Sequence, residues 1–395
     1  MKFKDYLAIK PEMLIEAINR HMEHLEDSVF DGQEGIEKNI QIVGPILQTL
    51  SGESKSISMK YDGAPAVIFG VNPDNGKFFV STKGIFAKEP KIAYSEKDID
   101  NLFSSGAGKK LKEAFRYLKQ TNPTNIYQGD LMFTQGDKKR ETIDGKQYIT
   151  FTPNTITYAI PADSKLANEI SIAKIGIVVH TRYKGEIGNL SAVFDVKANE
   201  FKKSSAVWLI DAFVNDVSSI NINDSELNQI EGIIKTINSN KSVVEKLDSK
   251  IVALLRTYKN NRIKSNIGIL KAEEGIKDFE SYVETVMDAE MVKVSSDKAK
   301  KTWEEKKRKM LEYIDNNSDN IILIFKIYNW FVKIKMIVLN KLNQIEGMGT
   351  FVKHGDGYKV TTPEGFVAIS GDGSVLKLVD RLEFSRLNFT MPKNW

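Results

Sequence analysis

Hydrophobic and polar positions divide this chain into segments with two different periods. Residues 11–51 carry apolar side chains at helical spacing, and residues 204–345 form long helical stretches rich in Lys, Glu, Ile and Leu. Between them, residues 63–199 have the pattern of short strands separated by turn signals, with a helix expected at 109–120. Strand signals return at residue 349. This pattern predicts an α+β protein in which helical and strand-rich regions alternate along the chain.

A lysine, an aspartate and a glycine stand close together at the end of one predicted strand. The run Ser56–Tyr61 alternates polar and apolar residues, as a half-buried strand does. Side chains two positions apart on a strand share a face, so Lys60 and Asp62 are expected to project together. Gly63 then lets the backbone approach a ligand closely. An amine beside a carboxylate suits attack on a phosphorus atom, whereas the simpler interpretation is a solvated strand lysine beside a turn.

Composition excludes several classes of site. The 395 residues leave room for two or three domains. They include no cysteine, which excludes disulfides, cysteine-ligated zinc and cysteine catalysis, and the four histidines show no paired metal-ligand spacing. The net charge of +4 permits nucleic-acid binding without demanding it, so any phosphate-binding surface must be local.

The long apolar segment at residues 321–335 is a candidate membrane span. Three lysines and Asn329 interrupt it, and each lysine costs about 2.5–3.5 kcal/mol at a bilayer centre. A buried or amphipathic helix is therefore predicted. The N-terminus meets no long apolar stretch of the kind found in signal peptides, so an intracellular, cytoplasmic protein is expected.

Further segments combine a predicted strand with a charged residue and a glycine. In chain order, the strand-associated charges are the Lys60 amine, a cation, two carboxylates and a second lysine. Each segment alone is weak evidence, but the order is informative. The segments after Lys60 are Phe78–Gly84, Asn125–Phe133, Pro363–Ile369 and Ser374–Val379.

That order resembles the covalent nucleotidyltransferase superfamily, specifically the ATP-dependent polynucleotide ligases, in a divergent and phage-like form. The resemblance covers about half of the chain and implies antiparallel sheets and helices around a nucleotide pocket. Motif III carries an aspartate where the family usually has glutamate, and motif Ia a lysine where it has arginine. The matching segments are Lys60–Gly63 for motif I, Ser81–Gly84 for motif Ia, Gly129–Leu131 for motif III, Glu364–Val367 for motif IV and Leu376–Val379 for motif V.

Two motifs admit alternatives. The family stacks an aromatic residue on adenine, and here His180 or Tyr183 after the strand at Ile175 is the nearest equivalent, with Tyr158 as the alternative. The same Ile175 strand could be taken for motif IV, but it carries isoleucine where the metal-binding acid belongs. Glu364 is therefore the preferred motif IV residue.

The resemblance implies a role for each matched side chain. Lys60 would become adenylated, Lys83 and Lys377 would clamp phosphates, and Asp130 and Glu364 would hold ribose or a Mg²⁺ (or Mn²⁺) ion. Only the first of the two motif V lysines is present, and Arg381 is a candidate to replace the second. The nucleotide-binding set implied for ATP is Lys60, Asp62, Gly63, Lys83, Asp130, His180 and Lys377.

Four regions are expected from the positions of these motifs. Residues 1–52 form an N-terminal helical region, 53–200 the first part of the nucleotidyltransferase domain, 201–348 a helical insertion and 349–395 the rest of that domain. Only 395 − 381 = 14 residues follow Arg381, so the OB-fold and motif VI that usually come next are not expected.

The helical insertion is the candidate for holding nucleic acid. Residues 298–309 concentrate cations around Trp303, and such a stripe could neutralise backbone phosphates. The simpler interpretation is a solvated helix face with Trp303 packed inward. The N-terminal helices could form an opposite jaw, where His21 and His24 are interpreted as ordinary helix residues. The predicted phosphate contacts are Lys300, Lys301, Lys307 and Arg308.

The resemblance therefore implies a monomeric ATP-dependent DNA ligase. It would seal nicks between a 5′-phosphate and a 3′-hydroxyl in duplexes through a lysyl-AMP intermediate, with some tolerance for RNA-containing strands. The alternatives are an RNA repair ligase, a capping guanylyltransferase and an inactive nucleic-acid-binding relative.

Overall fold

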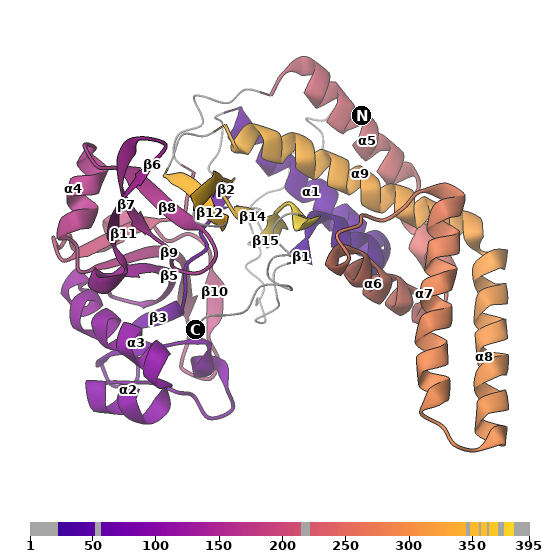
Figure 1. The fold of residues 1–395 in the computed structure, drawn as a ribbon, viewed down its shortest axis with the longest axis horizontal. Coiled ribbons are helices and arrows are strands. Elements are labelled where there is room, and N and C mark those ends of the chain that lie inside the picture. The colour runs from indigo at the N-terminus through magenta and orange to yellow at the C-terminus, as the bar shows by residue number, and fades with distance from the viewer. Residues whose placement is uncertain are drawn as a thin grey trace.

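The computed structural model describes most of the chain as a sheet-rich half and a helical half, with a small sheet between them (Figure 1). The α+β class is confirmed, and most strand pairs are antiparallel. The described residues are 23–51, 57–214, 222–344, 348–354, 357–361, 363–369 and 375–382.

The small sheet joins strands that lie far apart in the sequence. Its order is β1-β15-β14-β2, with β1 parallel to β15 and the other pairs antiparallel. One face is apolar and packs on the helical half, where α1 contacts β14. The opposite face carries the polar residues of the strands. The strands are β1 (Glu23–His24), β2 (Ile57–Lys60), β14 (Gly365–Ile369) and β15 (Val375–Leu378).

A six-stranded sheet forms the centre of the sheet-rich half. Its order is β10-β9-β5-β3-β4, and β11 pairs with β9 in parallel. The helices α2 (Glu96–Leu102) and α3 (Ser105–Leu118) bury apolar side chains against one face. The strands are β3 (Ala66–Val71), β4 (Phe78–Ser81), β5 (Ile126–Thr134), β9 (Ile175–Lys184), β10 (Ser191–Val193) and β11 (Val207–Asp211).

A five-stranded sheet completes the sheet-rich half. It combines strands that precede the helices α5–α9 in the sequence with strands that follow them. Strand β12, which follows, pairs with β8, which precedes, and the order is β13-β12-β8-β7-β6. Helix α4 (Lys165–Ile172) packs on β7 and β8. The strands are β6 (Lys139–Ile143), β7 (Lys146–Phe151), β8 (Thr157–Pro161), β12 (Gly349–His354) and β13 (Gly357–Val360).

The helical half has one apolar core, shared by N-terminal and later helices. The 3₁₀ helix η2 (Leu25–Asp31) packs against α1, α6 and α9, and α7 packs against α8 and α9. In Figure 1 the hairpin of α7 and α8 projects at the edge opposite the sheet-rich half. The helices are α1 (Gly32–Leu50), α5 (Asp224–Ser239), α6 (Ser249–Lys264), α7 (Ala272–Val292), α8 (Asp297–Asn316) and α9 (Ser318–Leu342).

Two expected boundaries require correction. The range 201–348 expected for the helical insertion includes β11, which belongs to the six-stranded sheet, so the helices begin at Asp224. The helical pattern over 11–51 holds for α1, but residues 23–31 form β1 and the 3₁₀ helix η2 instead. The helix expected at 109–120 is α3.

The apolar segment 321–335 lies inside α9. Eleven residues of α9 are buried, including Phe325, Phe331 and Lys335. Among helices of the described residues, none is both long and apolar enough to cross a bilayer. The segment is therefore a core helix, as its interrupting lysines predict.

Candidate functional site

Lys60 ends β2 on the polar face of the small sheet. Ile57 and Met59 contact the apolar core of the helical half, so the alternation of the strand places Ser58 and Lys60 on the other face. Gly365 is the partner of Lys60 in β14. The side chain of Lys60 is a quarter exposed. The amine is thus accessible at the end of a well-packed strand.

Glu364 is ion-paired to Lys60, since the Lys60 Nζ atom donates a hydrogen bond to Glu364 Oε2. Burial lowers the pKa of Lys60, but the charges of Glu364 and Asp130 outweigh burial and hold this pKa above its usual value. Burial also raises the pKa of the Glu364 carboxyl, although Lys60 opposes the change. Without a ligand, Lys60 is therefore a protonated ammonium ion with a carboxylate partner.

Gly63 permits a close approach between the loop after β2 and strand β5. A Cβ atom at this position would lie 2.6 Å from Asp130 Cβ and 3.0 Å from its carbonyl carbon. The next residue, Ala64, donates its N–H to the Leu131 carbonyl at 2.9 Å. Because Gly63 has no side chain, the loop after Lys60 can pack directly against Asp130.

Asp62 fixes a neighbouring loop. Its carboxylate accepts hydrogen bonds from Asn154 Nδ2 at 2.8 Å, from the Thr155 N–H at 2.7 Å and from the Ile156 N–H at 2.8 Å. Its own N–H donates to the Tyr158 hydroxyl at 2.7 Å. Asp62 is buried and supports the loop before β8, and its contact with nucleotide stays a prediction.

Asp130 and His180 face each other from β5 and β9. The two side chains are each about a quarter exposed, and His180 Nε2 lies 3.7 Å from Asp130 Oδ2. His180 Nδ1 also shares a hydrogen bond of 2.7 Å with the Thr181 hydroxyl. The register between the strands shifts beside Gly129, and such bulges commonly redirect side chains near functional sites. The pair forms one wall of the candidate site.

Lys377 and Lys83 supply further cations. Lys377 lies on β15 opposite Val367, on the same sheet face as Lys60. Burial lowers the pKa of Lys377, and the positive charges of Lys60 and Lys83 lower it further. Lys83 is exposed at the first position of the 3₁₀ helix η3 (Lys83–Phe86). The structure thus brings Lys60 and Lys83 within electrostatic range of Lys377.

The three candidates for stacking on adenine differ in exposure. Tyr158 is 2% exposed and packs between Tyr61 and Phe151. Tyr183 is 7% exposed, and its hydroxyl donates to Gln128 Oε1 at 2.6 Å. His180, at 25%, is the candidate whose ring is open to a ligand. The two tyrosines are core residues in this structure.

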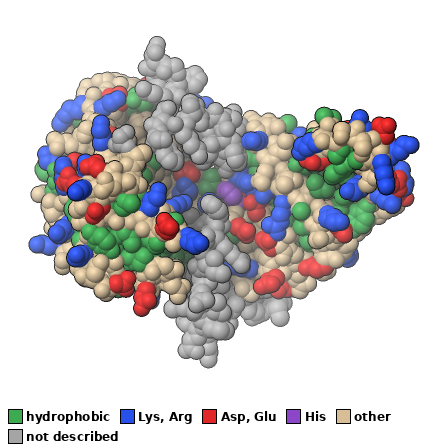
Figure 2. All heavy atoms as spheres, turned by 90° about the horizontal axis from the view of Figure 1, so that it is seen from below, with side chains coloured by type: hydrophobic (Ala, Val, Ile, Leu, Met, Phe, Trp, Pro, Cys, Tyr) green, Lys and Arg blue, Asp and Glu red, His purple; other side chains and the backbone are tan. Residues whose placement is uncertain are grey.

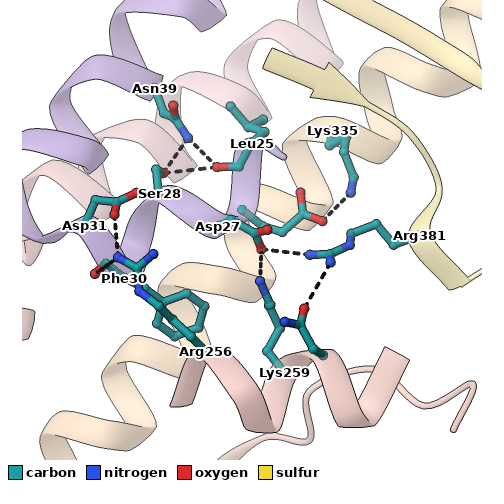
Figure 3. A network of polar contacts seen from close by, with 12 residues as sticks. Leu25, Asp27, Ser28, Phe30, Asp31, Asn39, Arg256, Lys259, Lys335 and Arg381 are labelled. Carbon is teal, nitrogen blue, oxygen red and sulfur yellow. Dashed lines mark hydrogen bonds and ion pairs between the residues drawn. The ribbon is translucent and has the colours of Figure 1, made fainter. Parts of the chain in front are cut away.

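Arg381 belongs to a buried polar network, where it joins the C-terminal strands to the helical half (Figure 3). Its guanidinium donates to Asp27 Oδ1 at 2.8 Å, and Lys259 Nζ lies 2.8 Å from the same oxygen. Nearby, Lys335 Nζ donates to Glu26 Oε1 at 2.6 Å. These contacts give Arg381 structural partners within the protein, and its motif V role stays a prediction.

His24 is a site residue that sequence reasoning missed. Helical periodicity suggested an ordinary helix position, but His24 lies on β1 and pairs with Lys377 of β15. Its ring is partly buried, and the Nδ1 atom is fully buried without a hydrogen-bond partner among the described residues. A two-residue strand leaves no periodic signal, so the sequence offered no means of finding it. His21 lies outside the described residues.

The cationic stripe of α8 is partly neutralised. Lys307 Nζ lies 2.9 Å from Asp288 of α7, and Arg308 pairs with Glu305 and Glu312 on its own helix. Lys306 Nζ stands 4.4 Å from the centre of the Trp303 ring. Among the described residues neither Lys300 nor Lys301 forms an ion pair, and both are exposed. Acidic partners therefore offset the charges of Lys307 and Arg308, while contact of the four residues with nucleic acid stays a prediction.

The donor set of the site suits a Mg²⁺ ion held largely by phosphates. Within the part of the chain that the structure describes, no group of three or more His, Asp or Glu side chains could coordinate a metal ion alone. Mg²⁺, however, usually takes one or two carboxylates together with substrate phosphates and waters. Asp130 and Glu364, whose charges both raise the pKa of Lys60, fit that pattern.

The site lies where the two halves of the molecule meet. Figure 2 shows basic and acidic side chains gathered with histidine in the hollow between the sheet-rich and helical parts. The polar face of the small sheet points away from the helical core, toward this region. The small sheet and the sheet-rich half thus contribute the site side chains described above.

Comparisons with known proteins give a single family. A family model described as a family of unknown function (DUF6267) matches residues 19–393. Neither a curated protein nor a solved structure matches the chain.

Proposed function

We propose that this chain, which belongs to the DUF6267 family, is an ATP-dependent polynucleotide ligase that seals 5′-phosphate/3′-hydroxyl nicks in duplexes. The observation that carries the proposal is the convergence on Lys60. Glu364 binds its ammonium group, Gly63 brings Asp130 against its loop, and Lys377 shares its sheet face. These are the residues that the resemblance to covalent nucleotidyltransferases assigns to motifs I, III, IV and V.

The first step would transfer AMP from ATP to Lys60. The Lys60 ammonium passes one proton to the Glu364 carboxylate, its hydrogen-bond partner, and becomes a nucleophilic amine. The amine attacks the α-phosphorus, a nitrogen–phosphorus bond forms, and the phosphorus–oxygen bond to the β-phosphate breaks with its electron pair leaving on pyrophosphate. Lys83 and Lys377 stabilise the charge on the phosphate oxygens. Bound Mg²⁺ would add further neutralisation of that charge.

Two later steps would close the nick. An oxygen of the 5′-phosphate attacks the AMP phosphorus and breaks the bond to Lys60 Nζ, which takes up a proton again. The 3′-hydroxyl then attacks the activated 5′-phosphate, forms the phosphodiester and releases AMP. Positioning of the reacting groups supplies much of the rate in phosphoryl transfer.

The decisive experiment is covalent labelling. The purified protein is incubated separately with α-³²P-labelled ATP and GTP in Mg²⁺, and the denatured protein is examined for acid-labile label. We expect label from ATP in the wild type and none in Lys60→Ala. Lys146→Ala, which changes an exposed lysine at the start of β7, is the matched control and should label normally. Absence of label in the wild type would refute the proposal.

The substrate is tested with the same preparation. Nicked DNA, nicked DNA–RNA hybrids and single-stranded RNA are compared at equal enzyme and salt concentrations. We expect sealing of nicked DNA with some joining of hybrids, because enclosure of a duplex recognises its shape and phosphates more than its bases. Efficient joining of single-stranded RNA with poor nick sealing would instead identify an RNA repair ligase.

A further inference from the structure

On the polar face of the small sheet, the basic side chains follow one another across the strands from β2 to β1. Register places His24, Lys377, Val367 and Ser58 in a row across β1, β15, β14 and β2. Lys60 is the next residue on the Ser58 side of this face. Neighbouring strands lie about 4.8 Å apart, so Lys377 is about two strand spacings from the Lys60 strand and His24 about three.

The geometry of in-line displacement predicts where the leaving group lies along this row. The nucleophile and the leaving group occupy opposite sides of the phosphorus during phosphoryl transfer. If the α-phosphate lies between Lys60 and Lys377, the β- and γ-phosphates extend beyond Lys377, toward β1. The residue that β1 presents there is His24.

The electrostatics of this end of the sheet also suit an anion. Behind His24 the buried network contains three cations, Lys259, Lys335 and Arg381, against the two carboxylates of Glu26 and Asp27. Glu23, Asp31 and Arg256 lie beside these groups and bring the sum of the charges to zero, so the positive charge offered to an anion here is that of Lys377. These cations lie close enough to influence His24. Burial lowers the pKa of His24, and the positive charges of Arg381, Lys335, Lys377 and Lys259 lower it further.

Unsatisfied polar atoms gather at the same place. His24 Nδ1, Arg381 Nε and Glu26 Oε2 are buried without hydrogen-bond partners among the described residues. Buried polar atoms are nearly always paired, so such a group indicates a ligand or bound water. An imidazole and a guanidinium nitrogen are donors suited to a phosphate oxygen.

We propose that His24, together with Lys377, binds the pyrophosphate leaving group of the adenylation step. This inference rests on the proposed function and adds to it a phosphate contact from the N-terminal segment of the chain. The resemblance to ligases assigns phosphate contacts to Lys83 and Lys377, and strand β1 adds a further one. The same contact binds free pyrophosphate when the reaction runs in reverse.

The reverse reaction tests the assignment. Protein carrying labelled AMP on Lys60 is isolated and mixed with pyrophosphate and Mg²⁺, and the return of label to ATP is timed. We expect His24→Leu to slow this reaction at least about tenfold, because a hydrogen bond to a charged group is lost. Transfer of AMP from the same pre-adenylated variant to a nicked duplex should proceed at the wild-type rate, since pyrophosphate takes no part in it.

A conservative variant separates contact from folding. Asparagine can place an amide nitrogen near the position of His Nδ1, so His24→Asn should recover much of the pyrophosphate reaction. Thermal unfolding with and without pyrophosphate gives a second measure, with stabilisation expected in the wild type and little in His24→Leu. Equal pyrophosphate rates in wild type and His24→Leu would overturn the inference and leave the ligase proposal standing. Failure of the wild type to label would remove both.

Discussion

The Lys60 ammonium donates a hydrogen bond to the Glu364 carboxylate, although 304 positions separate the two residues. The contact forms because β14 adds to β2 with Gly365 opposite Lys60. Gly365 has a φ of 148°, and a Cβ there would lie 2.4 Å from the Leu378 carbonyl oxygen. A glycine is therefore required where the acid meets the lysine.

Replacing the Glu364 carboxylate with a neutral side chain should lower the pKa of Lys60. Burial lowers the pKa of Lys60, and the Glu364 charge is the largest influence that raises it. In Glu364→Gln this pKa should fall, and neutral amine should appear at lower pH than in the wild type. Competitive acylation followed by mass spectrometry measures the pKa of Lys60, with the exposed Lys146 as an internal control. An unchanged titration would show that the carboxylate does not govern Lys60.

Adding one methyl group at Gly63 should disturb the site. In Gly63→Ala the new Cβ would lie 2.6 Å from Asp130 Cβ, so the Lys60 loop or β5 must move. We expect a loss of about 1–3 kcal/mol of stability and a weaker covalent label. Gly136→Ala is the matched control, because a Cβ at Gly136 meets nothing within 4 Å. Equal urea midpoints and labelling for both variants would contradict the close approach.

Acid should destabilise the protein through His24. Burial and neighbouring cations lower the pKa of His24, so the folded protein leaves the ring neutral while the unfolded chain protonates it below pH ~6.5. Stability is therefore lost as pH falls below that value, by up to about 1.4 kcal/mol per pH unit from this residue. Urea unfolding of wild type and His24→Asn at pH 7, 6 and 5 isolates the contribution. Parallel stability curves would exclude it.

The buried pair of Glu26 and Lys335 should be sensitive to loss of one partner. Both side chains are at most 3% exposed, so Lys335→Ala leaves a carboxylate in the core and should cost about 3–5 kcal/mol. Replacing both residues, as Glu26→Leu with Lys335→Met, should recover much of that loss. The exposed pair of Lys293 and Glu290 is the comparison, and Lys293→Ala should cost at most about 1 kcal/mol. Urea unfolding measures all three.

The two ends of the α8 stripe should behave differently toward nucleic acid. Neutralising Lys300 and Lys301 should weaken binding to nicked DNA and reduce the salt dependence by about 0.9 per lost phosphate contact. Neutralising Lys307 and Arg308, which already have acidic partners, should change binding less. Self-adenylation should be unaffected in both. Unchanged binding in the first variant would make α8 an ordinary solvated helix.

Local patterns in the sequence predicted the elements of the site that lie within one strand or turn. The alternation before Lys60 predicted β2, and the glycines at 63 and 365 were placed correctly beside charged residues. The segment 207–211 lies in a region that the sequence predicts to be helical, because a short, mainly apolar strand and a buried helix segment share the same pattern. Only its parallel pairing with β9 distinguishes them.

Long-range contacts were beyond local reasoning. Nothing near Asp62 in the sequence indicates that its carboxylate holds the N–H groups of Thr155 and Ile156. Likewise, His24 enters the site through a two-residue strand whose partner, Lys377, lies near the other end of the chain. Such placements depend on tertiary packing, which a single sequence does not encode in its periodicity.

The arrangement of the small sheet has a consequence for biosynthesis. Ribosomes add about 5–20 residues per second, so Glu364 is made roughly 15–60 s after Lys60. Throughout that interval β2 lacks the neighbour that gives Lys60 its carboxylate. A nascent chain that has completed only its first strands therefore holds the nucleophile but cannot yet use it, and competence for nucleotide chemistry is expected only after Glu364 and β14 have been made.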